Sequence, residues 1–399
     1  MLTPLILAKS VLLAIPLAFL AGLVLPLRAV LRVPLAILAG WLLAVLVQLV
    51  LGTGFVAYLA SFAVLACVYA VLSLGLNVQW GYTGLFNIGI AAFFAVGAFT
   101  SALFTTAMPT GPIAAFTQQA FGLEMPFLVG VLAAGVVAGL LAWLVGIPTL
   151  RLREDYLAIA TIGIAEVVRL IFQNERWLAN GPQPLRGIPQ PLTCLLDEPV
   201  CSWLPGALQT LFSPLDARDY SFVYLAIVTL FVVVIYLILE RMLRSPWGRV
   251  LRAVREDEAS AEMSGKDAAS FRMQAFVVGA IVMGMGGALY AHYLISIDYS
   301  HFNPLYATFL IWVMLMLGGS GNNRGAVLGA FAIWAVWSGT VFVIDDLMRP
   351  VLASISPELA ARAPYLRYLF IALLLLAILL YRPKGILEEE KTVSRVARE

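Results

Sequence analysis

The stretch YSFVYLAIVTLFVVVIYLIL, from Tyr220 to Leu239, contains no charged residue and is long enough to cross a lipid bilayer as a helix. Similar uncharged runs recur along the chain. Because hydrocarbon offers no hydrogen-bond partners, a spanning segment must be a helix or a strand of a closed barrel. The runs lack the two-residue alternation of barrel strands. The sequence therefore predicts an all-α, polytopic transmembrane bundle.

The composition is typical of a chain that spans a lipid bilayer. Of its 399 residues 62% are hydrophobic and 12% are charged, against about 25% charged in ordinary soluble domains. The first run, about Leu12 to Leu27, is not followed by a signal-peptide cleavage site, and we expect it to be retained. We predict ten or eleven spans, at residues 10–27, 34–51, 54–78, 84–106, 126–147, 155–173, 220–239, 272–294, 306–318, 325–344 and 365–381.

The basic residues near the ends of these runs predict the orientation of the bundle. Short cytoplasmic loops are enriched in Lys and Arg, and all the basic groups in short flanks fall on one face: Arg28 and Arg32; Arg151 and Arg153; residues 241–272; Arg324; and the tail from Arg382. We therefore expect a cytoplasmic carboxyl terminus. Eleven spans place the amino terminus outside with Lys9. Ten place it inside, if the first run lies in the interface or Gly84 to Thr106 dips in and returns.

Two loops are longer than a helical bundle requires. The outer loop, about residues 174–219, contains Cys194 and Cys201, which either form a disulfide in an oxidising periplasm or remain two free thiols. Cys67 lies in the middle of a span, where we expect it to serve packing. The chain thus divides into two amino-terminal spans (1–51), a core (52–387) and a charged tail (388–399).

The cytoplasmic loop, about residues 240–272, is the most highly charged part of the chain, with seven basic and six acidic residues. Ser245 followed by Pro246 is typical of a helix start, and Gly265 is a plausible stop. Apolar residues recur at helical spacing and form one stripe: Trp247, Val250, Leu251 and Val254. Arg249, Arg252, Arg255 and Glu256 point elsewhere. We predict an amphipathic helix that docks on a soluble partner, the alternative being a helix resting on the membrane surface.

Four motifs then resemble a known family in the same order. They are the loop from Arg244 to Gly265 (RSPWGRVLRAVREDEASAEMSG), the glycine-rich stretch from Gly75 to Gly97, the segments Leu150 to Thr161 and Glu166 to Arg169, and Leu317 to Gly321 (LGGSG). Together they resemble the LivM-like permeases of branched-chain amino acid ABC importers, over about Leu72 to Leu387. The chain departs from the pattern at Ile90, where many relatives carry a histidine, and in the turn Asn180 to Gly187.

The resemblance implies a permease subunit of the bacterial inner membrane, which transports branched-chain amino acids. Its implied partners are a homologous second permease, two cytoplasmic ABC ATPases and a periplasmic substrate-binding protein. The residues implied in coupling to the ATPases are Arg252, Arg255, Glu256, Asp257, Glu258, Ala259 and Gly265. A permease for urea or short-chain amides is the alternative within the class.

Polar residues inside the predicted spans are candidates for the translocation path. Asn77, Tyr82, Thr83 and Asn87 surround a glycine break at Gly81 and Gly84, and transporters place binding groups on interrupted helices. Glu166 and Arg169 lie three residues apart on one helix face. They either sense the charged groups of an amino acid or form a structural ion pair that locks two helices.

A second glycine cluster precedes and enters the span at 325–344. Gly321, Gly325 and Gly329 are spaced by four, with Gly318 and Gly319 just before them. Such spacing predicts a groove along one helix face that permits close helix packing in lipid. The alternative is a direct role in a gate.

Other functional classes lack their signatures. No phosphate-binding G-x-x-x-x-G-K-[ST] pattern, metal-ligand cluster or catalytic motif occurs, so we expect no catalysis, cofactor or metal, and a separate ATPase. No basic stripe with interleaved aromatic residues indicates nucleic acid. An ion-coupled secondary transporter would need an inverted repeat and several buried carboxylates, and a membrane-embedded transferase would need an acid-base cluster.

Overall fold

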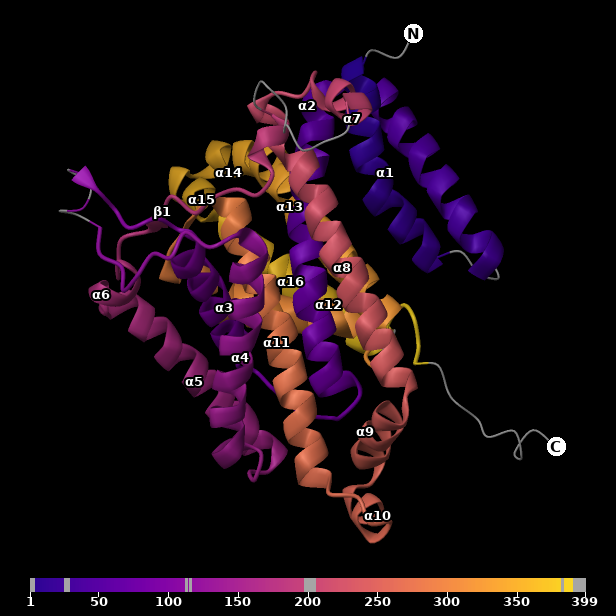
Figure 1. The fold of residues 1–399 in the computed structure, drawn as a ribbon, viewed down its shortest axis with the longest axis vertical. Helices are drawn as coiled ribbons and strands as arrows, with labels where there is room; N and C mark the ends of the chain where they lie inside the picture. Colours follow the sequence, from indigo (N-terminus) through magenta and orange to yellow (C-terminus); the bar gives the residue numbers. More distant parts are fainter. Residues whose placement is uncertain are drawn as a thin grey trace.

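The computed structural model describes residues 4–24, 29–111, 114, 117–196, 206–381 and 384–389. Helices dominate it (Figure 1). The longer helices are α1 (Pro4–Val24), α2 (Ala29–Leu76), α3 (Ile90–Thr105), α4 (Phe127–Thr149), α5 (Glu154–Asn174), α8 (Tyr220–Arg244), α11 (Ala268–Leu294), α13 (Asn323–Phe342) and α16 (Leu366–Tyr381). The shorter ones are α6 (Arg176–Ala179), α7 (Gly206–Phe212), α9 (Pro246–Glu256), α10 (Glu258–Met263), α12 (Leu310–Gly318), α14 (Arg349–Ile355) and α15 (Pro357–Arg362). Two-residue strands, β1 (Leu185–Arg186) and β2 (Ser296–Ile297), pair antiparallel.

The polytopic, all-α prediction is confirmed. Within the described residues, seven helical segments are long and apolar enough to span a membrane, and three shorter apolar helices accompany them. These ten segments match ten of the predicted spans. The exception is 155–173, which is helical as α5 but carries charged side chains at both its start and its middle and is not among the ten.

The spans predicted at 34–51 and 54–78 match the apolar segments Pro34–Val50 and Phe55–Gly81, and both belong to α2, whose early part lies beside α1 and whose later part lies in the central bundle (Figure 1). One predicted boundary was wrong. The span predicted to begin at Gly84 begins at Ile90 instead. Gly84 has a φ of +75°, a left-handed conformation that an α-helix cannot continue.

The centre of the bundle is packed through small residues. α3, α4 and α11 contact one another, and a Cβ atom on Gly97 would lie 2.5 Å from the Cα of Gly284. Lipid tails are as apolar as the helices, so close backbone approach is what holds such helices together. The same part of the core contains the buried rings of Phe93, Phe94 and Phe276.

The bundle has two ends with different structure. At one end α9 and α10 project below the spanning helices (Figure 1); we call it the α9 end. At the other end Lys9 of α1 forms an ion pair of 2.7 Å with Asp219, the residue that precedes α8; we call it the Lys9 end. Lys9 therefore lies on the side of the predicted outer loop, as the eleven-span alternative expects.

Candidate functional site

The α9 end contains the predicted coupling helix. α9 begins at Pro246 with Ser245 at its N-cap, as predicted, because the fixed φ of proline suits the first helical position. It ends at Glu256 rather than continuing toward Gly265. Asp257 interrupts the helix and caps α10, its carboxylate accepting from the Ser260 amide at 3.2 Å. Hydrogen bonds from the Ser260 hydroxyl and amide lower the pKa of Asp257.

The apolar stripe of α9 is used within the chain. Leu251 is completely buried in the main core, and Val254 packs with Ala261 and Ala268. Leu251 and Val254 are therefore covered by protein, whereas Trp247 and Val250 are half-buried and line cavities that open to the surface.

Arg252 and Arg255 were predicted to point away from the stripe, and both make contacts within the chain; their part in coupling to an ATPase stays a prediction. One terminal guanidinium nitrogen of Arg255 donates a hydrogen bond to the carbonyl of Gly81. The other donates to the carboxylate of Glu389, at 2.8 Å. Arg252 lies over the ring of Tyr82, 5.4 Å from its centroid. Burial raises the pKa of Tyr82, so its phenol stays protonated. The two arginines thus connect α9 to the predicted glycine break.

The remaining predicted coupling residues are exposed. Glu256, Asp257, Glu258, Ala259 and Gly265 lie on the surface of α9, α10 and the turn that follows. Glu258 also pairs with Arg272 of α11 at 3.1 Å. Between α9 and α10 opens a cavity of about 540 Å³, whose lining includes Arg249, Val250 and Lys266. This face combines both charges with a partly apolar hollow, as protein-docking surfaces do.

The predicted glycine break exists and lies above α9. α2 ends at Leu76, a π-helical turn covers Asn77–Gly81, and the chain stays non-helical until Ile90. π-Helical turns are rare and occur frequently at functional sites.

The polar side chains of the break are buried and bonded within the chain. Asn77 donates to the Asn323 side chain and accepts from the Gly321 amide, both at 2.9 Å. Asn87 donates to Gln79 at 2.7 Å. Thr83 donates to a backbone carbonyl at 3.0 Å. These groups fix the shape of the break, and their hydrogen bonds are satisfied without a ligand.

Glu166 and Arg169 form an ion pair within α5, with Arg169 Nε 2.9 Å from Glu166 Oε2. The pair does not itself join two helices. Arg169 reaches a second segment by lying over the ring of Tyr299, 5.7 Å from its centroid. The Glu166 side chain is 41% exposed, so the pair lies on the periphery of the bundle.

The late glycines bring α12 and α13 into close contact. A Cβ atom on Gly329 would lie 2.8 Å from the Cα of Gly318, and Gly318 also faces Gly325. Gly319 and Gly321 have positive φ angles and form the turn before α13. Gly321 therefore does not belong to the helix face predicted from the four-residue spacing.

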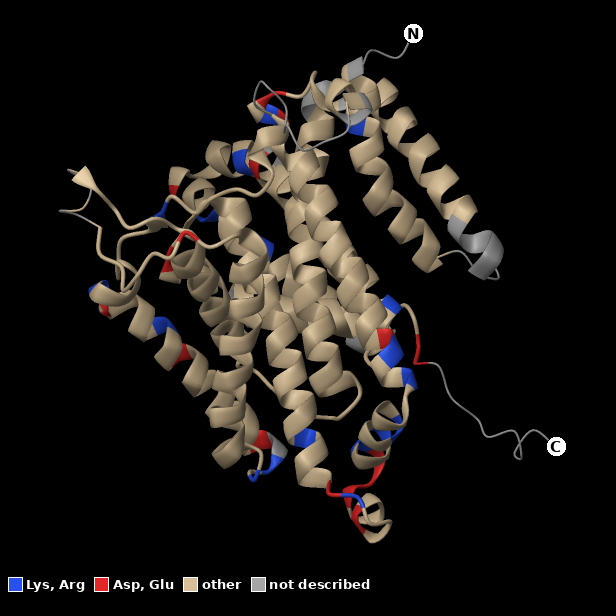
Figure 2. Ribbon diagram, viewed as in Figure 1, with Lys and Arg blue, Asp and Glu red and all other residues tan. Residues whose placement is uncertain are grey.

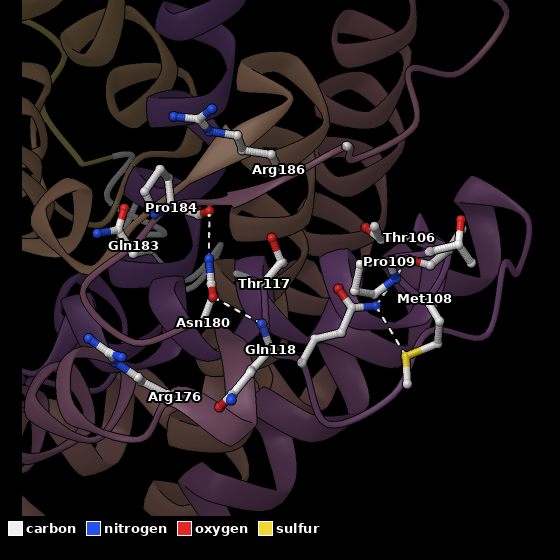
Figure 3. A pocket seen from close by; sticks show the side chains of 14 residues that line it. Thr106, Met108, Pro109, Thr117, Gln118, Arg176, Asn180, Gln183, Pro184 and Arg186 are labelled. Atoms are coloured by element: carbon white, nitrogen blue, oxygen red, sulfur yellow. Dashed lines mark hydrogen bonds between the residues drawn. The ribbon is translucent and has the colours of Figure 1, made fainter. Parts of the chain in front are cut away.

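The Lys9 end contains a large cavity of about 870 Å³, for which the sequence suggested no lining residues (Figure 3). Asn180, in a left-handed conformation at the end of α6, shapes it by accepting from the Gln118 amide at 3.0 Å and donating to the Pro184 carbonyl at 3.2 Å. Arg176 and Arg186 line it with these groups. The signal in the sequence was the turn Asn180 to Gly187, noted only as a partial family match.

The cysteines divide between core and loop. Cys67 is a buried, free thiol. Cys194 is disulfide-bonded. Its predicted partner, Cys201, lies outside the described residues, so the pairing stays a prediction. In the part of the chain that the structure describes, no group of three or more His, Cys, Asp or Glu side chains is arranged to hold a metal.

Comparison with known proteins gives the family. The family described as the permease component of branched-chain amino acid transport systems matches residues 58–379. The chain belongs to this family. The match begins in the later part of α2, ends in α16 and includes α9, the break and the cavity at the Lys9 end. This permease is a multi-pass membrane protein.

Individual relatives agree with the family match. The chain is 27% identical over 82% of its length to a probable LivM permease of Methanocaldococcus jannaschii, covering 92% of that protein. It is 30% identical over 82% of its length to the LivM permeases of Salmonella typhimurium and Escherichia coli, described as high-affinity branched-chain amino acid systems, covering 69% of each. No solved structure matches the chain.

Proposed function

We propose that this permease forms half of an import pathway for branched-chain amino acids in a bacterial inner membrane. A homologous second permease supplies the other half, two cytoplasmic ABC ATPases bind the α9 end, and a periplasmic binding protein delivers substrate at the Lys9 end. The carboxyl terminus is cytoplasmic in this proposal.

The observation that carries the proposal is the position of α9. Its outer face is polar and open, while its inner face holds the Gly81 carbonyl through Arg255. A partner that moves α9 therefore acts on a break in a spanning helix through the side chains of Arg255 and Arg252. The relatives' names supply the substrate class.

The charge distribution supports the orientation. Lys, Arg, Asp and Glu gather around α9 and α10, whereas the central helices are almost free of them (Figure 2). Two cavities flank α9 here, and each contains four arginines in its lining. Cytoplasmic ends of spanning helices carry such an excess of basic residues.

The cavity at the Lys9 end, which we call the outer cavity, is the proposed docking site for the binding protein. It is wide, its walls come from the segments around Met108 and Gln118 and from 176–187, and it carries Arg176 and Arg186. Guanidinium groups are suited to bidentate bonds with carboxylates. We expect acidic side chains of the binding protein at this cavity.

Uptake assays test the substrate and the energy source. In a deletion strain complemented with this chain and its transport partners, labelled leucine should accumulate and labelled urea should not. Uptake should stop in ATP-depleted vesicles and survive an uncoupler that collapses ion gradients. Urea uptake without leucine uptake would move the chain to the amide importers, and the reverse energy dependence would indicate a secondary transporter.

A pair of variants tests the docking face. Glu256→Lys reverses an exposed charge on α9, and we expect it to reduce the ATPase stimulation by loaded binding protein while insertion stays normal. Glu358→Lys changes an exposed residue of α15 and serves as the control. Equal stimulation in both variants would refute the docking assignment.

A further inference from the structure

A short segment after α16 lies against the turn between α12 and α13. We call this segment, Lys384–Glu389, the strap. The Ile386 and Leu387 amides donate to the carbonyls of Leu317 and Gly318 at 2.8 and 3.0 Å. A Cβ atom on Gly385 would lie 2.5 Å from the Cα of Gly319, so the strap approaches the turn as closely as backbone allows.

The strap ends in a carboxylate that is held from one side by Arg255. Glu389 receives 2.8 Å and 3.1 Å hydrogen bonds from the same guanidinium nitrogen, and the two side chains are 29% and 24% exposed. A Cβ atom on Gly321 would lie 2.9 Å from the Glu389 Cδ, so glycine there makes room for the carboxylate.

The surroundings favour a negative charge at this position. The adjoining cavity, of about 350 Å³, is lined by four arginines and only two carboxylates, those of Glu240 and Glu389. The arginines are Arg244, Arg249, Arg252 and Arg324. Partly buried charges of opposite sign are screened less by salt than fully exposed ones.

The same guanidinium also holds the helix break. Its second terminal nitrogen donates to the Gly81 carbonyl, and Asn77 links the break to the α12–α13 turn through Gly321 and Asn323. One arginine of α9 thus contacts the break directly and the turn through the strap. Arginine is suited to this because its planar fork fixes two acceptors at once.

We propose that Glu389 is a positioning residue for transport: it fixes Arg255 so that a displacement of α9 reaches the break at Gly81 and the α12–α13 turn together. This inference rests on the proposed function of α9. Glu389 itself contacts neither substrate nor nucleotide in this scheme. Without the carboxylate, Arg255 loses one of its two anchors, and movement of α9 is transmitted incompletely.

The first test uses the full chain alone in detergent and needs no transport. Hydrogen exchange should be at least about 5-fold faster at the amides of residues 82–85 and Gly321 in Glu389→Gln than in the wild type. The matched control is Glu388→Gln, because the Glu388 side chain is exposed and reaches Lys384 at 3.7 Å. Unchanged exchange in Glu389→Gln, or equal acceleration in the control, would overturn the proposal.

The second test uses the complete transporter with its ATPases and loaded binding protein. Substrate moved per ATP hydrolysed should fall by about 5-fold or more in Glu389→Gln, with Glu389→Asp in between and Glu388→Gln at the wild-type ratio. A variant that only unfolds lowers both transport and hydrolysis and is identified by its melting temperature. Wild-type transport with an unchanged ratio in Glu389→Gln refutes the role of Glu389 but leaves the proposed function intact.

A double-mutant cycle tests whether Arg255 and Glu389 act together or independently. Arg255→Lys loses the fork, so adding Glu389→Gln should lower the transport ratio by little more. Losses that multiply would mean that the two residues act separately, and would contradict the proposal.

Discussion

The buried side chain of Asn77 holds the helix break to the start of α13 through two hydrogen bonds. Its amide donates to Asn323 and accepts from the Gly321 amide, and no part of it is exposed. Asn77→Ala leaves those two groups without their partner, which costs about 1–3 kcal/mol for each buried polar group. We expect a lower melting temperature in detergent, whereas Asn174→Ala, at an exposed helix end, should melt as the wild type. Equal melting of both variants would contradict this.

Gly265 ends α10 in a backbone conformation that few residues adopt. Its φ is +76°, a Cβ atom there would meet nothing within 4 Å, and its amide donates to Glu262 at 2.8 Å. Gly265→Asn should keep ATPase stimulation, because asparagine tolerates this conformation. Gly265→Pro should lose it, because proline fixes φ near −65° and has no amide hydrogen. Comparing stimulation in the two variants checks the prediction, and a functional proline variant would refute it.

At the scale of the elements, the start and the apolar stripe of α9 could be predicted from the sequence, whereas the contacts of its arginines could not. Its start at Pro246 and its apolar stripe depend on neighbours within four residues, so capping and periodicity found them. The inward turn of Arg255 depends on Gly81 and Glu389, 174 and 134 residues away. Helical spacing carries no information about such partners, so the contacts that Arg255 makes within the chain were not predicted.

The amino-terminal helix α1 is fixed to the bundle by a buried ion pair. The side chains of Lys9 and Asp219 are each 10% exposed, and Lys9 also lies over the ring of Phe222. Removing one partner of a buried pair costs about 3–5 kcal/mol, while replacing both is often nearly neutral. We expect Lys9→Met to melt well below the wild type and Lys9→Met with Asp219→Asn to recover part of the loss. A double variant worse than the single one would show that no pair is formed.

At the scale of the whole molecule, the hydrophobic runs were sufficient to predict the spanning helices. Burial in lipid requires a run of about 20 apolar residues whatever its neighbours do, so composition alone found ten of the segments. The span predicted at 155–173, which is α5, is not among them, and the start predicted at Gly84 was wrong because local backbone conformation decides there. The cavity at the Lys9 end was not predicted, because its walls come from separate loops that only the fold brings together.

Cysteines introduced at the two ends of the bundle should be labelled from opposite sides of the membrane. Glu124 is exposed near the Lys9 end and Glu262 is exposed on α10. In right-side-out vesicles a membrane-impermeant maleimide should label Glu124→Cys above the wild-type background and leave Glu262→Cys unlabelled. Inside-out vesicles should give the reverse. Labelling of both from one side would disprove the orientation.

The strap also has a consequence for how the permease is made. Glu389 follows Arg255 by 134 residues, so at about 5–20 residues per second a ribosome needs roughly 7 to 27 s between them. During that interval α9 is already synthesised, but its second anchor is missing. An ATPase that binds a nascent subunit then meets a helix without its full connection to the break. In the proposed scheme the subunit therefore responds fully only after Glu389 has been synthesised.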